Sequence, residues 1–272
     1  MRALSIMLLL AGIVAGMNVA HAEDHVLTLS IGPVTRQFTA AQLLARADAT
    51  ELSVPADVSY GRPMKYRAVP LLPLLGGVAA FDTLEARAAD GFVSQIPLSL
   101  VEKGGSGGSK AWVAIEEPTA SWPALPGKSA SAGPFYLVWE DPQRSDVGSE
   151  QWPYQLASVT AVESPAHRWP QIVVDASLAA DAPARRGQAV YTTQCLPCHR
   201  MKGAGAGEMG PDLGKPMNPV QYLSAKGLRE LIRNPAGVRT WPQQQMPAFD
   251  ETMLREPDLD ALVAYLAHMA TR

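Results

Sequence analysis

The string Cys195-Leu196-Pro197-Cys198-His199 contains both cysteines of this 272-residue chain. A disulfide framework would normally use several cysteine pairs spread along the sequence. A structural zinc site needs four ligands, and no second cysteine pair is present to complete the tetrahedron. A thioredoxin-like dithiol would follow a strand in a βαβ unit, whereas this string interrupts helical sequence. The two thiols and the histidine therefore need another explanation.

The spacing CxxCH is the attachment pattern of c-type haem. Two thiols add across the two vinyl groups of the porphyrin, and the adjacent histidine is delivered beneath the ring as an iron ligand. We therefore predict one covalent haem c, with Cys195 and Cys198 as thioether anchors and His199 as the proximal ligand. A low-spin electron carrier also needs a sixth ligand, commonly methionine or histidine.

The region around this motif has a helical pattern. From residue 184 onward the sequence reads as helix, most clearly where apolar residues recur at i, i+3, i+4 and i+7 between Leu259 and Leu266. Pro257 marks the start of that last helix. We expect a small all-α domain over residues 184–272.

The preceding region differs in its periodicity. Short alternating segments at residues 26–31, 95–98, 111–115, 135–139 and 154–162 predict strands. Two short helices are expected at residues 39–45, capped by Thr39, and at residues 70–75. Residues 23–163 are therefore predicted to form a mixed domain, which makes the fold class α+β. Residues 164–183 are rich in proline and alanine and are typical of an extended linker.

The first 22 residues resemble an export signal. Arg2 precedes an apolar stretch at residues 3–15, and Ala20-His21-Ala22 has the small-x-small pattern of a cleavage site. An uncleaved anchor is the alternative, but the apolar stretch is shorter than the roughly 20 residues that span a bilayer. We expect a signal peptide at residues 1–22, a periplasmic protein, and no stable membrane insertion after cleavage.

The charge distribution excludes one class of partner. The net charge is −3, and no run of like charge forms the basic patch that nucleic acid requires. Residues 23–183 have 11 basic and 18 acidic side chains, a net of −7, and residues 184–272 have 11 basic and 8 acidic, a net of +3. Such asymmetry can serve solubility, or it can attract two domains or two partners to each other.

The C-terminal region resembles the small class I cytochrome c domain over nearly all of residues 184–272. The resemblance covers the motif CLPCH and, in order, Gly187, Tyr191, residues 210–213 (GPDL), the helix at residues 224–233, residues 246–249 (MPAF) and residues 262–266. It implies that the first and last helices cross where Gly187 and Tyr191 meet Tyr265 and Leu266. It also implies electron transfer as the function.

The same resemblance implies the rest of the haem site. The Pro211 carbonyl would orient His199, and Met246 would be the distal iron ligand. Competing methionines, each by default a core residue, are Met201, Met209, Met217 and Met253. Trp241 would pack on the haem edge or reach a propionate, or it is a plain core tryptophan. With His199 and Met246 on the iron, no position is left for substrate.

The N-terminal region is similar to a degenerate sulfite-oxidase-like molybdopterin-binding domain. The motifs lie, in order, at residues 66–75, 89–92, 97–98, 133–139 and 152–162. Enzymes of that family hold molybdenum through a cysteine thiolate, and here both cysteines belong to CLPCH. The resemblance therefore implies a retained scaffold without its metal ligand.

Two function classes follow. The first is a non-enzymatic electron carrier between a periplasmic dehydrogenase and the respiratory chain, whose N-terminal domain docks a redox partner or positions the haem. The second is an enzyme whose N-terminal domain binds a pterin or another redox cofactor and passes electrons to the haem. The missing cysteine favours the first. A structural or sensory module with a vestigial haem is a third, weaker reading.

Overall fold

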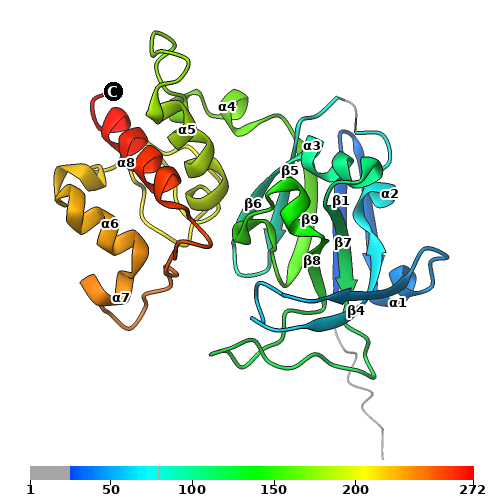
Figure 1. The fold of residues 1–272 in the computed structure, drawn as a ribbon. Helices are drawn as coiled ribbons and strands as arrows, with labels where there is room; N and C mark the ends of the chain where they lie inside the picture. The colour runs from blue at the N-terminus through cyan, green and yellow to red at the C-terminus, as the bar shows by residue number, and fades with distance from the viewer. Residues whose placement is uncertain (1–24, 79) are drawn as a thin grey trace, which may run out of the picture.

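A computed structural model describes residues 25–78 and 80–272 of the chain. It has a β-rich part and a helical part, each with its own cluster of buried side chains (Figure 1). The predicted α+β class is therefore confirmed. The predicted signal peptide, residues 1–22, lies outside the described residues. Within the described part of the chain, no helix has the length and apolar character needed to cross a membrane.

The β-rich part, residues 25–163, is called the β domain here. It has a five-stranded sheet in the order β2-β1-β9-β5-β6 and a four-stranded sheet in the order β3-β4-β7-β8. All strand pairs are antiparallel except β1 with β9. The elements are β1 (Val26–Ile31), β2 (Val34–Thr39), α1 (Ala40–Leu44), β3 (Thr50–Val54), β4 (Met64–Pro70), α2 (Leu71–Leu75), β5 (Thr83–Ala88), β6 (Val93–Pro97), α3 (Leu98–Glu102), β7 (Lys110–Ile115), β8 (Phe135–Glu140) and β9 (Leu156–Val162).

The two sheets of the β domain share one hydrophobic core. Strand β1 alternates, so Leu27 and Leu29 are fully buried while Thr28 between them is only half-buried. Strands β7 and β8 are apolar almost throughout, and their side chains fill the centre. Helix α1 begins at the predicted cap: the Thr39 hydroxyl accepts from Gln42 N, and the Gln42 side chain accepts from Thr39 N.

The helical part, residues 184–272, is called the helical domain here. Its elements, together with the end of the connecting segment, are α5 (Pro183–Val190), a π-helical turn η5 (Tyr191–Cys195), a 3-10 turn η6 (Pro219–Gln221), α6 (Ala225–Arg233), α7 (Pro235–Val238) and α8 (Glu256–Ala270). Helices α5 and α8 lie side by side (Figure 1). A Cβ on Gly187 would lie 1.9 Å from the Ala261 carbonyl oxygen, so only glycine allows this approach. The Tyr191 and Tyr265 rings are 5.1 Å apart, and the predicted helix crossing is present.

The segment between the two domains differs from the extended linker that was predicted. It contains the short helix α4 (Pro165–Arg168) and a 3-10 turn, η4 (Pro170–Ile172). Ile172 is fully buried in the core of the helical domain, and its carbonyl accepts a 2.7 Å hydrogen bond from the Tyr265 hydroxyl. At its other end, Arg168 forms a 2.7 Å ion pair with Glu85 of β5. The prolines limit regular structure, but tertiary contacts fasten the segment to both domains.

Candidate haem site

The CLPCH motif lies at the end of the first helix of the helical domain. Helix α5 continues into the π-helical turn η5, which ends at Cys195. The backbone N–H groups of Cys198 and His199 both donate to the Cys195 carbonyl, at 3.1 and 2.8 Å. This tight turn places both thiols and the imidazole within one turn of chain. The motif therefore presents its three functional groups together, as haem attachment requires.

The imidazole of His199 is held by the predicted neighbour. Its Nδ1 lies 2.8 Å from the Pro211 carbonyl oxygen. Because a carbonyl can only accept, Nδ1 carries the proton, and the lone pair of Nε2 is left for a metal. A Cβ on Gly210 would lie 2.3 Å from the ring, so the GPDL turn approaches the imidazole through a glycine. Burial lowers the pKa of His199, which favours the neutral, ligating form.

The two thiols of the motif are free and half-buried. Burial raises the pKa of Cys195, and it raises the pKa of Cys198 to about 12. The charge of Glu150, from the β domain, raises the pKa of both thiols further. Both sulfurs are therefore protonated thiols at neutral pH, the form from which S–H adds across a vinyl group.

The methionines differ in their surroundings. Met246 and Met253 are both half-buried against the core of the helical domain. Met201 is fully buried, and its backbone pairs with Ala204. The Met209 sulfur lies 3.9 Å from the Cys198 sulfur, and Met217 is 47% exposed. Met246 thus has the partial burial suited to a ligand at the edge of a core, and Met253 shares it.

Trp241 lies on the same long loop as Met246, between α7 and α8. Its side chain is 44% exposed, and the Arg239 guanidinium lies over its ring at 5.1 Å. A plain core tryptophan, one of the two roles considered for it, does not fit this exposure. The structure thus brings Cys195, Cys198, His199 and Pro211 together. Met246 and Trp241 belong to a separate loop, between α7 and α8.

The donor set of this site fits a haem c. Two free thiols are spaced for the two vinyl groups, and a neutral imidazole has a free Nε2. A methionine thioether, such as that of Met246, is a soft donor and suits iron(II). Each element of the set comes from the helical domain.

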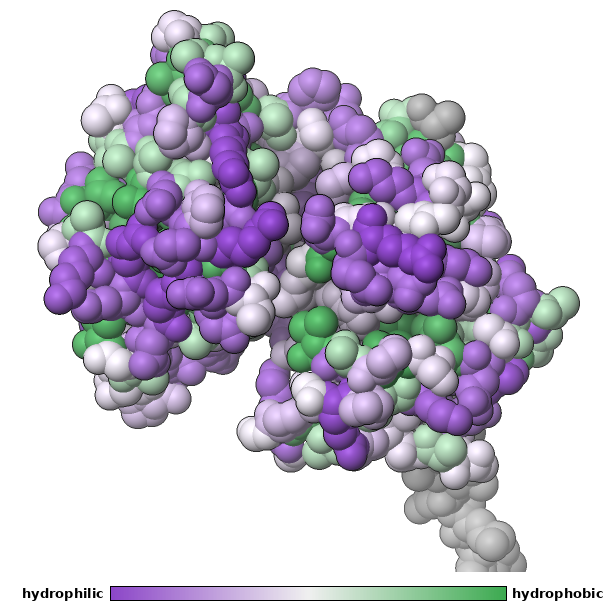
Figure 2. Space-filling view, viewed as in Figure 1, coloured by the Kyte–Doolittle hydropathy of each residue, from purple (hydrophilic) through white to green (hydrophobic). Residues whose placement is uncertain are grey.

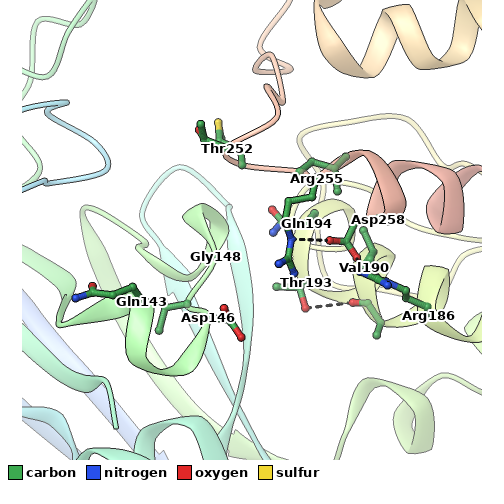
Figure 3. A pocket seen from close by; sticks show the side chains of 14 residues that line it. Gln143, Asp146, Gly148, Arg186, Val190, Thr193, Gln194, Thr252, Arg255 and Asp258 are labelled. Carbon is green, nitrogen blue, oxygen red and sulfur yellow. Dashed lines mark hydrogen bonds and ion pairs between the residues drawn. The ribbon is translucent and has the colours of Figure 1, made fainter.

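Sequence reasoning missed that the β domain also contacts the motif. The Val93 N–H of β6 donates to the Pro197 carbonyl at 3.2 Å. A cleft of about 470 Å³ also lies between the domains (Figure 3), lined by Gln143, Asp146 and Gly148 of the β domain and by Arg186 and Gln194 of the helical domain. In Figure 2 the hollow between the domains is bordered largely by hydrophilic residues. No local pattern in the sequence signals this contact, because its residues are far apart along the chain.

Comparison with known proteins agrees with the geometry of the helical domain. Residues 184–270 match the family model for cytochrome c. A search of curated proteins found no match. The matched range contains CLPCH, Pro211, Trp241 and Met246. The family match and the arrangement around His199 together support a C-terminal c-type cytochrome domain that transfers electrons through a covalently bound haem.

Proposed function

We propose that this protein is an exported, periplasmic cytochrome with one haem c, which passes electrons from a periplasmic dehydrogenase to the respiratory chain. The observation that carries the proposal is the His199 imidazole, held at Nδ1 by Pro211 beside two free thiols. The leader pattern at residues 1–22 supports export.

The residues of the helical domain have distinct roles in this proposal. Cys195 and Cys198 anchor the porphyrin, and the Nε2 atom of His199 binds the iron. The Pro211 carbonyl keeps the proton on Nδ1 and fixes the plane of the ring. Met246 would be the second protein ligand of the iron and would exclude water and substrate from the metal. The bound haem supplies a one-electron iron couple, and methionine ligation raises its reduction potential.

We infer that the β domain is a docking module of sulfite-oxidase-like descent without its own cofactor. The residues of that resemblance fall on defined elements: Pro70 caps α2, residues 135–139 lie in β8, and residues 156–162 form β9. The Asp57 carboxylate in its core is already paired and accepts from Tyr66 and Tyr136, whereas the buried Gln95 Oε1 and Trp152 Nε1 have no hydrogen-bond partner among the described residues. Its lack of cysteine supports the same inference, because molybdenum in this fold is held by a thiolate.

The test is chemical analysis of the purified holoprotein, produced with its haem-attachment machinery. Denaturing electrophoresis with haem-peroxidase staining should show a band that Cys198→Ala removes or strongly weakens. Analysis for molybdenum, tungsten and pterin should find none in stoichiometric amount. A band without stain in the wild type overturns the cytochrome proposal. A stoichiometric pterin or second metal overturns the carrier proposal in favour of an enzyme.

A further inference from the structure

The β domain supplies part of the surroundings of the haem anchor. A 3-10 turn, η3 (Ser149–Gln151), and strand β6 both contact the π-helical turn η5 that ends at Cys195. Besides the Val93 to Pro197 hydrogen bond, Gly148 packs against Gln194, whose Nε2 would be 2.8 Å from a Cβ at position 148. In the part of the chain that the structure describes, no ion pair joins the two domains. Close backbone packing therefore sets this contact.

The turn η3 is fixed to the β domain by hydrogen bonds. The Ser94 hydroxyl of β6 donates to the Glu150 carbonyl at 2.7 Å. The Trp139 indole of β8 donates to the Gln151 carbonyl at 2.8 Å, and the Gln151 side chain accepts from Gly148 N at 2.9 Å. Hydrogen bonds from strands β6 and β8 of the β domain therefore fix the backbone at Glu150.

Glu150 is the central residue of η3, the turn that packs against η5 and therefore against the end of η5 at Cys195. The negative charge of Glu150 raises the pKa of Cys195 and of Cys198, in agreement with the packing of η3 against η5. Among the ion pairs of the described residues, none includes Glu150, and its side-chain partner is the Ser149 hydroxyl at 3.4 Å. Burial at the domain contact raises the pKa of Glu150 to about 7.

The other ionisable groups at this contact are few. Asp90, on the turn between β5 and β6, also raises the pKa of Cys198, but it is exposed and therefore screened by water and salt. The helical-domain groups whose pKa the Glu150 charge raises are the two cysteines, which haem attachment would convert into neutral thioethers. Glu150 is thus a half-buried carboxylate of the β domain at the contact with the turn that would carry the porphyrin.

We propose that Glu150 couples haem reduction to proton uptake, so that the β domain completes the redox site of the helical domain. While the iron is ferric, its positive charge favours the Glu150 carboxylate. When a one-electron redox protein reduces the iron, that attraction weakens, and the carboxylate takes a proton from solvent to become a carboxylic acid. Oxidation releases the same proton. This inference rests on the proposed haem function, and it gives the β domain a role beyond docking.

The size of the effect follows from linkage. The reduction potential and the proton affinity of Glu150 must change each other reciprocally. Each tenfold increase in the proton affinity of Glu150 on reduction corresponds to 59 mV in the potential of a one-electron couple. The potential should therefore fall as pH rises through the range in which Glu150 ionises, around pH 7.

The experiment is a redox titration of the full-length holoprotein from about pH 5 to about pH 9, a range that spans the raised Glu150 value. Wild type should show a falling potential, and Glu150→Gln should lose a measurable part of that slope and have a higher potential at alkaline pH. Glu150→Asp, which keeps the carboxylate, should retain the slope with a shifted midpoint. Glu163→Gln changes an exposed carboxylate of the same domain and should match wild type.

The haem propionates and Asp90 also titrate, so the inference depends on the difference between variants. A slope in Glu150→Gln equal to that of wild type overturns it, and so does a slope that only Asp90→Asn removes. If Glu150→Gln does not fold, redox-difference infrared spectroscopy of the wild type decides the question. A protonated carboxyl band that appears on reduction supports the inference, and its absence overturns it. Wild type without haem would instead overturn the proposed function itself.

Discussion

The β domain and the helical domain hold their functional groups in different ways. In the β domain, the buried Asp57 carboxylate accepts hydrogen bonds from Ser59 N, Tyr60 N, Tyr66 and Tyr136, and strands surround it. In the helical domain, His199 relies on the Pro211 carbonyl and lies on a loop. The β domain thus supplies all of these partners of its buried carboxylate from its own residues. The haem site depends instead on one helix crossing and a few contacts.

The largest effect is expected at that helix crossing. In Gly187→Ala, the new methyl group would overlap the Ala261 carbonyl and the Tyr265 Cβ, so α5 and α8 must separate. Overpacking of this kind costs about 1–3 kcal/mol or more. Urea unfolding monitored at the haem Soret band should shift strongly. Gly77→Ala, where a Cβ meets open space in the β domain, is the matched control. Equal shifts of the urea midpoint in the two variants would contradict the view that the helical domain depends on this helix crossing.

The next effect concerns the loop between α7 and α8. In Met246→Ala, we expect complete loss of the near-infrared sulfur-to-iron charge-transfer band and a lower reduction potential, because a thioether ligand favours iron(II). The control is Met253→Ala, which removes the other half-buried methionine of that loop. A band that survives in Met246→Ala and disappears in Met253→Ala would assign the sixth ligand to Met253.

A moderate effect is expected in the β domain from Asp57→Asn. The amide would place an N–H group against donors that now face a carboxylate oxygen, and one unsatisfied buried polar group costs about 1–3 kcal/mol. Near-ultraviolet circular dichroism should show earlier unfolding of the β domain while the haem absorption keeps its midpoint. Asp181→Asn, at an exposed position, should leave both unchanged. Simultaneous loss of both signals would show that the domains unfold as one unit.

The smallest effect is the pH dependence of stability that comes from Glu150. Its pKa is raised from an ordinary 4.5 to about 7, so folding favours the protonated form. The stability that Glu150 contributes is fully present below about pH 4.5 and is lost as pH rises through about 7. Urea midpoints should fall less over this range in Glu150→Gln than in wild type. Parallel pH profiles for the two proteins would show that Glu150 is solvated at the contact.

Regular elements with strong periodicity were predictable from the sequence. Strands β1, β7, β8 and β9 and helix α8 were expected close to their observed bounds because each has a strong apolar pattern. Strand β2 was missed because it is an edge strand with little buried side-chain surface, and β5 because two of its three inward residues after Thr83 are small alanines. Residues 164–183 differ from the extended linker that was predicted, because their proline content gave no sign that Ile172 is buried.

The sequence by itself determined the chemistry of the haem anchor. The spacing of Cys195, Cys198 and His199 is covalent and local, so the chain specifies it wherever the motif lies. The tertiary structure alone decided what surrounds that anchor. The turn η3 with Glu150 contacts η5, and the Val93 N–H donates to the Pro197 carbonyl, only because the two domains pack against each other. Such contacts join residues with no sequence relation, and they arise from the burial and hydrogen bonding of the whole fold.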